Sequence, residues 1–192
     1  MEQYIKQFAN HSQYESYISG GVALPNVSLC VNENEVHYNP VVNETRLTLT
    51  YNVEDSEGWC RLYNNNAVIL PIGVEIDGTA VSFSDIYYGW YQFSTTGQHT
   101  VKIEYQDNTF IPYKAFQECA DIVEVIIPDC VVSVGQTGYG GWVFNHCTSL
   151  TNVVFNENTL QTVHSGSFCD CPLNNEVETR LASLYEGSTL CD

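Results

Sequence analysis

One phrase in the sequence recurs with a fixed internal spacing. Phe116, Phe144 and Phe168 are each followed three residues later by a cysteine. The phenylalanines lie 144 − 116 = 28 and 168 − 144 = 24 residues apart. Such a period is typical of repeat proteins, in which each unit buries its apolar face against its neighbours. The sequence therefore predicts stacked units in its C-terminal half.

The two offsets differ because one copy is longer. Val134 to Phe144 spans ten residues, whereas Val163 to Phe168 spans five. The extra residues fall in the glycine-containing segment 136–140. We interpret this segment as an insertion into a unit of about 23 to 24 residues.

The pattern inside each unit is that of leucine-rich repeats. Residues 150–160 fit L-x-x-L-x-L-x-x-N-x-L, and residues 122–132 fit it with cysteine in place of asparagine. The apolar motif positions are expected to point inward and to stack on their equivalents. Residues between them should point outward, and their mixed polarity suits protein contact better than catalysis. These candidate binding residues are Glu124, Ile126, Asn152 and Val154.

The insertion with its flanking residues, Gly135 to Trp142, supplies a second candidate surface. Tyr139 and Trp142 offer flat amphipathic faces, suited to stacking on a sugar or packing on a partner protein. The alternative is that Trp142 folds back into the core. The sequence leaves both possibilities open.

Residues 42–110 alternate between apolar and polar in the manner of strands. Leu47, Leu49 and Tyr51 share one face, and Asp77-Gly78 is typical of a hairpin turn. This pattern predicts a small antiparallel sandwich of immunoglobulin-like size. An offset of 52 residues also aligns segment 101–103 with segment 153–155, and Ile111 with Val163. We therefore expect the last of these strands to be the first strand of the repeat stack, and the two parts to share a core.

The repeat pattern stops after Leu173. A helix is predicted beyond it, because Val177, Leu181 and Leu184 fall on one helical face. We expect Asn175 as its N-cap and Gly187 as its stop. This helix would cap the open end of the stack.

The first 41 residues differ from the rest. Residues 2–18 predict a short amphipathic helix, and residues 24–40 predict extended segments broken at Pro25, within 32–34 and at Asn39-Pro40. We expect an arm, residues 1–41, that docks on another chain and supports a homo-oligomer. Its candidate contact residues are Tyr4, Phe8, Tyr14, Tyr17, His37 and Tyr38.

The charge balance excludes some partners. With 23 acidic and 6 basic residues, the chain carries a formal net charge of −17, which repels nucleic acids and anionic membranes. The carboxylates are scattered and form no calcium-binding loop. The sequence shows neither an export signal nor an apolar run of about 20 residues. We expect a soluble protein made in the cytoplasm.

Catalysis and metal binding have little support. None of the 8 cysteines forms a C-x-x-C pair, so buried free thiols are expected. Cys147 beside His146 could act as a nucleophile with its base, but its repeat position favours a core thiol. Cys169, Cys171 and His164 fall short of a four-ligand zinc site. We therefore expect no enzyme, no cofactor and no metal.

The phrase A-F-x-x-C-x-x-[IL]-x-x-V-x-[IF] resembles the BspA-like, treponemal-type leucine-rich repeats. The resemblance covers residues 111–173 and includes the Phe and Cys positions. It implies adhesion to host proteins, to other cells or to surfaces. This chain departs from the family in its few repeats and in the inserted segment 136–140.

Residues 24–40, with the upstream stretch 10–18, look like an opening segment of virion proteins of phages that infect gut bacteria, including crAss-like phages. This resemblance implies a virion structural protein, such as a capsid decoration, head-fibre or tail-associated subunit. Its arm would bind other virion proteins or sister subunits, and the rest would face a host surface glycan or protein. The alternative is a binding module of a bacterial cell-surface adhesin, which predicts export and disulfides.

Together these patterns predict a mainly β chain of three parts. Residues 1–41 would be the docking arm, and residues 42–110 an Ig-like β-sandwich. Residues 111–192 would be a short leucine-rich-repeat solenoid with a C-terminal capping helix.

Overall fold

The computed structural model describes residues 27–32, 35–40, 44–136, 138–139, 141–186 and 191. The chain forms two compact units, Met1–Glu44 and Thr45–Asp192. The predicted helix over 2–18, with Tyr4, Phe8, Tyr14 and Tyr17, lies outside the described residues. Within the described part, no helix is long and apolar enough to cross a membrane.

The first unit contains an antiparallel hairpin. β1 (Val27–Asn32) pairs with β2 (Glu35–Pro40), with Cys30 opposite His37 and Leu29 opposite Tyr38. Two extended segments are confirmed, one on each side of residues 33–34. The break expected at Asn39-Pro40 is wrong, because β2 continues through both residues and a proline is tolerated at the end of a strand. The break expected at Pro25 lies outside the described residues. The docking role of His37 and Tyr38 stays a prediction, because only their backbone is described.

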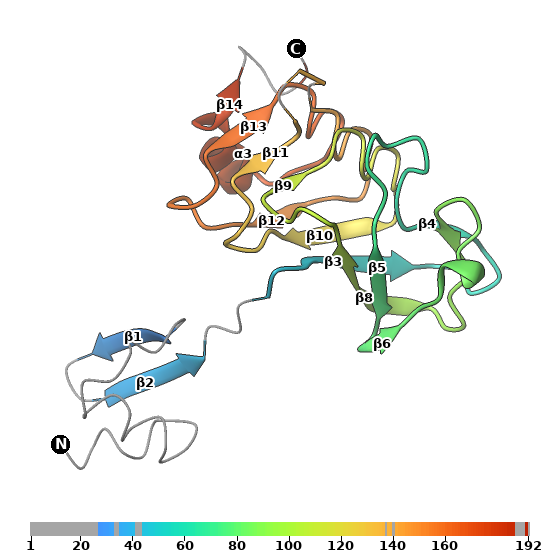
Figure 1. Cartoon of the computed structure of the whole chain (residues 1–192), viewed down its shortest axis with the longest axis horizontal. Coiled ribbons are helices and arrows are strands. Elements are labelled where there is room, and N and C mark those ends of the chain that lie inside the picture. Colours follow the sequence, from blue (N-terminus) through green and yellow to red (C-terminus); the bar gives the residue numbers. More distant parts are fainter. Residues whose placement is uncertain are drawn as a thin grey trace. The chain divides into compact units, whose positions relative to one another are not determined.

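The second unit is built on a mixed six-stranded sheet in the order β12-β10-β3-β8-β5-β6 (Figure 1). β10 is antiparallel to β3 and parallel to β12, whereas β3, β8, β5 and β6 form antiparallel pairs. The strands are β3 (Leu47–Val53), β5 (Gly73–Ile76), β6 (Thr79–Ala80), β8 (Gly97–Glu104), β10 (Ile122–Ile126) and β12 (Asn152–Val154).

A second, parallel sheet has the order β14-β13-β11-β9. Its strands are β9 (Phe110–Ile111), β11 (Ser133–Val134), β13 (Thr162–His164) and β14 (Tyr185–Glu186). Val134 pairs with Ile111 on one side and with Val163 on the other. The predicted alignment of Ile111 with Val163 is therefore confirmed, since both lie in register with Val134.

A short antiparallel pair completes the strands. β4 (Cys60–Arg61) pairs with β7 (Trp90–Tyr91), and the 3-10 helix η1 (Phe83–Asp85) precedes β7 in the chain. This pair lies at the end of the unit away from β14 (Figure 1).

The repeated phenylalanines form a buried stack. Neighbouring ring centroids are 5.2 Å apart from Phe116 to Phe144 and again from Phe144 to Phe168, with nearly parallel planes. The cysteines that follow Phe144 and Phe168 each contact the preceding unit. The Cys147 thiol donates to the Phe116 carbonyl at 3.1 Å, and the Cys171 thiol donates to the Phe144 carbonyl at 3.0 Å. These contacts explain the fixed Phe-x-x-Cys spacing.

The predicted Ig-like sandwich beside a solenoid is not what the structure shows. The antiparallel strands continue through β10 into the parallel pair with β12, so the repeat strands β10 and β12 belong to the same sheet as the antiparallel strands. β3 separates β8 from β10, so the expectation that segment 101–103 begins the repeat stack is wrong. The reason is that β3 forms ladders along both of its edges, with β8 and with β10.

One hydrophobic core runs through the second unit. Leu49 and Val101 of the antiparallel strands belong to the same buried cluster as Ile122 and Val153 of the repeat strands. The expected sharing of a core is confirmed for residues 45–192.

The N-cap of the C-terminal helix lies one residue earlier than predicted, and the expected cap Asn175 is the first residue of the helix. α3 (Asn175–Ala182) has Asn174 as its N-cap, because the Asn174 side-chain oxygen accepts the Val177 N–H at 3.0 Å. It ends at Ser183 rather than continuing to Gly187, because the chain then forms β14 at the edge of the parallel sheet. The end of the stack is thus covered by a helix and a strand.

Candidate binding surfaces

The outward residues of β10 and β12 form two cross-strand pairs. Ile126 lies opposite Val154, and their side chains are 41% and 43% exposed. Glu124 lies opposite Asn152, whose amide donates to the Glu124 carboxylate at 2.6 Å. Parallel pairing places equivalent residues side by side, which brings the four predicted residues onto one small surface.

The strands that carry this surface are anchored in the hydrophobic core. Val125 and Val153, which alternate with the outward residues, are buried in the core. Because alternate residues of a strand point to opposite faces, burial of these two fixes the outward direction of their neighbours. The surface is therefore presented by a rigid sheet.

The insertion places both of its aromatic residues at the surface. Tyr139 is 57% exposed and Trp142 is 46% exposed. The open question about Trp142 is thus decided against a core position. Its indole lies over Gly166, where an added Cβ would be 2.8 Å from Cδ1, and the Lys114 ammonium lies 5.5 Å from the ring centroid.

Two positions in each unit have a left-handed backbone. Lys114, Trp142 and Gly166, two residues before the phenylalanines, have φ values of 59°, 56° and 71°. Two residues after the phenylalanines lie Glu118, His146 and Asp170, with φ values of 63°, 59° and 59°. These turns aim the second set at solvent, where the His146 Nδ1 lies 3.0 Å from the Asp170 carboxylate.

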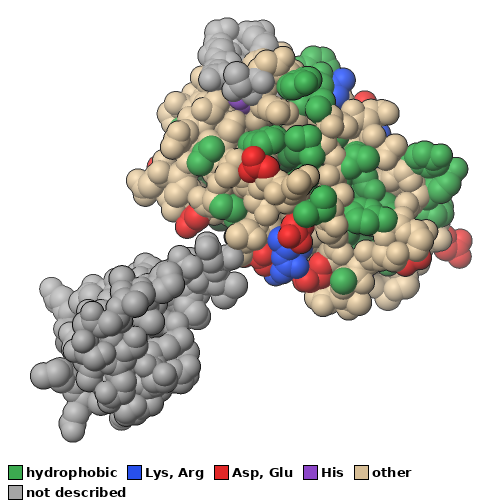
Figure 2. Space-filling view, in the orientation of Figure 1, with side chains coloured by type: hydrophobic (Ala, Val, Ile, Leu, Met, Phe, Trp, Pro, Cys, Tyr) green, Lys and Arg blue, Asp and Glu red, His purple; other side chains and the backbone are tan. Residues whose placement is uncertain are grey.

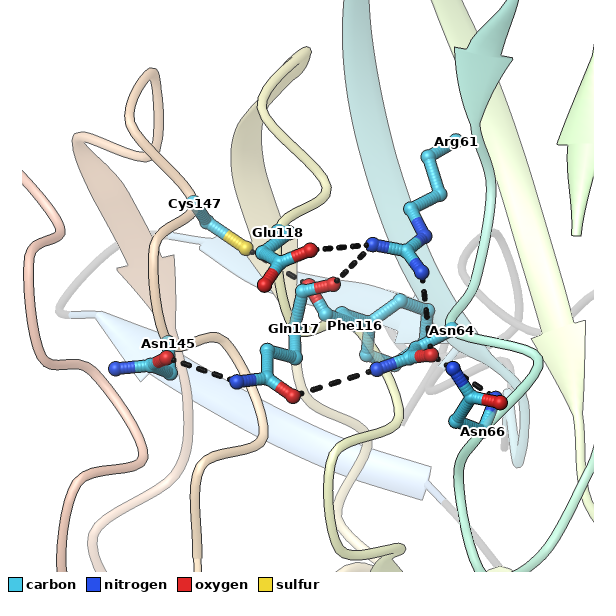
Figure 3. A network of polar contacts seen from close by, with 8 residues as sticks. All are labelled: Arg61, Asn64, Asn66, Phe116, Gln117, Glu118, Asn145 and Cys147. Carbon is cyan, nitrogen blue, oxygen red and sulfur yellow. Dashed lines mark hydrogen bonds and ion pairs between the residues drawn. The ribbon is translucent and has the colours of Figure 1, made fainter.

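A buried row of amides joins the antiparallel part to the repeats (Figure 3). Asn64 donates to the Gln117 side-chain oxygen at 3.4 Å, and Gln117 donates to the Asn145 side-chain oxygen at 3.1 Å. Gln117 and Asn145 each follow a stacked phenylalanine. The sequence signal for this row was an amide residue directly after two of the repeated phenylalanines, and the sequence reasoning missed it.

The same network holds Arg61 in place. Its guanidinium donates to the Glu118 carboxylate at 2.9 Å, to the Asn64 side-chain oxygen at 3.2 Å and to the Gln117 carbonyl at 3.3 Å (Figure 3). It also lies over the Trp90 ring, 5.5 Å from the centroid. Arg61 thereby links the repeats to β7.

An aromatic cluster surrounds this point, and the sequence reasoning missed it as well. Trp59, Tyr87, Tyr88 and Trp90 are 52%, 66%, 65% and 38% exposed. Ring centroids are 6.4 Å apart between Trp59 and Tyr87, and 4.8 Å apart between Tyr87 and Tyr88. Figure 2 shows hydrophobic side chains gathered at the surface around β4. The sequence signal was Tyr-Tyr-Gly-Trp, three aromatic residues around a turn glycine.

The adjacent residues His146 and Cys147 face different environments. Cys147 is fully buried, and burial raises the pKa of its thiol well above the usual value. His146 is exposed. The two side chains therefore do not form a nucleophile–base pair, because the thiol is held un-ionised in the core.

One expectation about the cysteines is wrong. Cys169 and Cys191 form a disulfide, with Cα atoms 4.7 Å apart. Cys169 directly follows the stacked Phe168 and is not one of the repeated Phe-x-x-Cys cysteines, so it is available to bond Cys191. Among the described residues, Cys60, Cys119, Cys130, Cys147 and Cys171 are free, and no cluster of three or more metal-ligand side chains is present.

The stacked phenylalanines, the in-register parallel strands and the exposed strand face together define a leucine-rich-repeat protein. Residues 86–186, more than half of the chain, match the family described as BspA type leucine rich repeat region (6 copies). The chain therefore belongs to the BspA-type leucine-rich-repeat family. The match also extends upstream of residue 111, where the sequence resemblance began.

No curated protein and no solved structure matches the chain. The resemblance of the N-terminal segment to virion proteins gains no support from the comparisons. Repeats of the BspA type point to a module for binding or adhesion.

Proposed function

We propose that this chain is a non-catalytic binding module of the adhesion type. The carrying observation is the pair Ile126 and Val154, two aliphatic side chains held side by side in solvent by a rigid sheet. The neighbouring Glu124–Asn152 pair supplies a polar edge. An apolar centre with a polar border is the usual anatomy of a protein–protein contact, which supports a protein on the target surface as the partner.

The non-catalytic character is supported by the thiols and by the proposed surface. The best nucleophile candidate, Cys147, donates to a main-chain carbonyl inside the core. Glu124 is bonded to an amide at the proposed surface, whereas hydrolysis of a glycan needs two carboxyl groups placed across the scissile bond. A screen for release of reducing ends from capsular polysaccharide tests this part, and any release would contradict it.

A pair of matched variants tests the binding surface. Ile126→Asp with Val154→Asp places two charges at the centre of the surface, and we expect binding of the labelled full chain to target cells to fall about tenfold or more. Val132→Asp is the control, because Val132 is also a repeat valine and is 39% exposed. Flow cytometry with intact bacterial and epithelial cells provides the measurement. Equal loss in both variants, or loss in neither, would contradict the assigned surface.

The setting of this module is a further part of the proposal. The Cys169–Cys191 disulfide supports work outside a reducing cytoplasm. A capsid decoration, head fibre or tail-associated subunit of a phage meets this condition, and so does a bacterial surface adhesin. The virion setting depends on the resemblance of the N-terminal segment, and mass spectrometry of purified virions that lacked the chain would reject it.

The proposed docking arm has its own test. If residues 1–41 bind sister subunits or other virion proteins, removal of these residues should lower the oligomeric state of the full chain. Light scattering coupled to size exclusion measures this directly. Unchanged assembly after truncation would remove the arm and the homo-oligomer from the proposal.

A further inference from the structure

The aromatic cluster of Trp59, Tyr87, Tyr88 and Trp90 lies outside the strand surface proposed above. Its members come from two segments, the loop before β4 and the turn before β7. The Gln92 amide donates to the Glu57 carbonyl at 3.0 Å, which ties these segments together. The cluster is therefore assembled by the fold from residues about 30 positions apart.

The turn that presents two of these rings is tight and specifically built. Tyr87 and Trp90 exchange both backbone hydrogen bonds, at 2.8 and 2.9 Å, and the two residues between them have φ values of 51° and 87°. Gly89 fits because an added Cβ would collide with the Tyr63 carbonyl. No comparable steric requirement explains Tyr88, because a positive φ at this turn position favours Asn, Asp or Gly over tyrosine. A strained aromatic residue, pointing to solvent, is better explained by binding than by folding.

A cation of the chain itself is already bound at this cluster. Arg61 lies over Trp90 and pairs with Glu118, so one guanidinium is already bound between an aromatic face and a carboxylate. Trp59, Tyr87 and Tyr88 expose further rings of the same kind. Aromatic faces attract cations, and Trp and Tyr do so better than Phe.

The charge around the cluster also favours a cationic partner. The segments that carry the cluster also carry exposed carboxylates, and Arg61 is their one basic residue. The exposed acidic residues on these segments and on the adjoining repeat turn are Glu54, Asp55, Glu57, Asp85 and Glu118. A second copy of this chain is a poor partner for this particular surface, because it carries only 6 basic residues against 23 acidic ones.

We propose that Trp59, Tyr87, Tyr88 and Trp90 form a docking surface for a lysine- or arginine-bearing segment of a partner protein. The partner's cationic groups stack on the exposed rings, and the surrounding carboxylates complete their ion pairs. Trp, Tyr and Arg are also the residues that contribute most to protein interfaces. This surface is separate from the Ile126–Val154 surface, so either can fail without the other.

Titration calorimetry with the full chain tests the proposal. The probe is a short synthetic peptide alternating arginine and serine, used at about 150 mM salt to screen bulk charge. The comparison probes are the same peptide with glutamate in place of arginine and a neutral oligosaccharide. We expect binding of the arginine peptide alone. Trp59→Ala with Tyr87→Ala should weaken it about tenfold.

The control variant is Leu70→Ala with Ile72→Ala, which also removes two exposed apolar side chains, neither of them assigned to a binding surface, and leaves the charge unchanged. It should bind the arginine peptide as the unmodified chain does. The proposal would be overturned by equal weakening in both variants, by absence of peptide binding, or by cluster-dependent binding of the neutral sugar. Cluster-dependent self-association of the peptide-free chain would overturn it as well. Circular dichroism confirms that both variants are folded.

Discussion

In the second and third units, the cysteine that follows the stacked phenylalanine donates to a main-chain carbonyl of the preceding unit. Cys147 does this for Phe116, and Cys171 does it for Phe144. A thiol is a weak donor on a small apolar side chain, so it can reach this carbonyl without bringing a strongly polar group into the core. The spacing of one phenylalanine and one cysteine per unit thus reflects a packing requirement rather than a reactive site.

Replacement of the central ring should be costly. Phe144 is fully buried and has a phenylalanine on each side. We expect Phe144→Ala to lower the free energy of unfolding by about 3 to 5 kcal/mol, because the cavity is bounded by stacked units that cannot close it. Phe83→Ala, at a 43% exposed position, is the control and should change stability by no more than about 0.5 kcal/mol. Urea titration measures both, and similar losses would argue against the stack.

Cys60 should titrate far from an ordinary thiol. Burial raises its pKa from 9.0 to about 12, and the nearby Asp121 carboxylate adds to the shift. At pH 9 only about one thiol in a thousand would be ionised in the folded chain, because three pKa units separate the two values. The rate of iodoacetamide alkylation of native Cys60 should therefore keep rising up to about pH 12.

The same shift has a consequence for stability. The unfolded chain releases the Cys60 proton near pH 9 and the folded chain near pH 12, so this group lowers stability as pH rises above 9. Asp121→Asn should lower the pKa of Cys60 and speed its alkylation. A native alkylation profile that levels off near pH 9 would contradict the burial of this thiol.

At the scale of elements, the spacing of the repeats predicted the structure better than local patterns of single strands and helix ends did. The period of the phenylalanines predicted the stack because every copy repeats the same inward residues. The position of β3 between β8 and β10 could not be predicted, since both neighbours are apolar strands and the order of strands depends on pairing between distant segments. Asn174 and Asn175 are chemically identical candidates for a cap, and only the backbone geometry distinguishes them.

The candidate sites on strands could be predicted from the sequence, whereas those in loops and turns could not. Ile126 and Val154 were predicted because strand alternation fixes which residues point outward. The aromatic cluster was missed because Trp59 lies in a loop and Tyr87 in a turn, where no periodicity indicates exposure. Trp142 was left open because the glycines around it permit either orientation.

The helix cap offers a matched test within one element. Asn174→Ala removes the acceptor for the Val177 N–H and the side-chain bond to the Thr151 carbonyl. We expect a loss of about 1 kcal/mol in the free energy of unfolding. Asn175→Ala, one residue later and exposed, should leave stability almost unchanged, because alanine is favourable inside a helix. A larger loss in Asn175→Ala would place the cap where the sequence suggested.

At the scale of the molecule, the repeats and the mixed sheet behave as one body. β10 belongs to the antiparallel ladder with β3 and to the parallel ladder with β12. The amide row from Asn64 through Gln117 to Asn145 crosses the same boundary. A short stack of repeats gains stability from a shared core that it could not build alone, and this fixes the exposed residues for binding.

The most direct test compares unfolding on the two sides of this shared core. Trp142→Phe leaves Trp59 and Trp90 as fluorescent probes of the antiparallel part, and Trp59→Phe with Trp90→Phe leaves Trp142 as the probe of the repeats. All three indoles are partly exposed, so these changes should disturb the core little. If residues 45–192 form one cooperative unit, the two variants will show the same urea midpoint and slope. Two separated transitions, with the repeats unfolding apart from the sheet, would contradict the account.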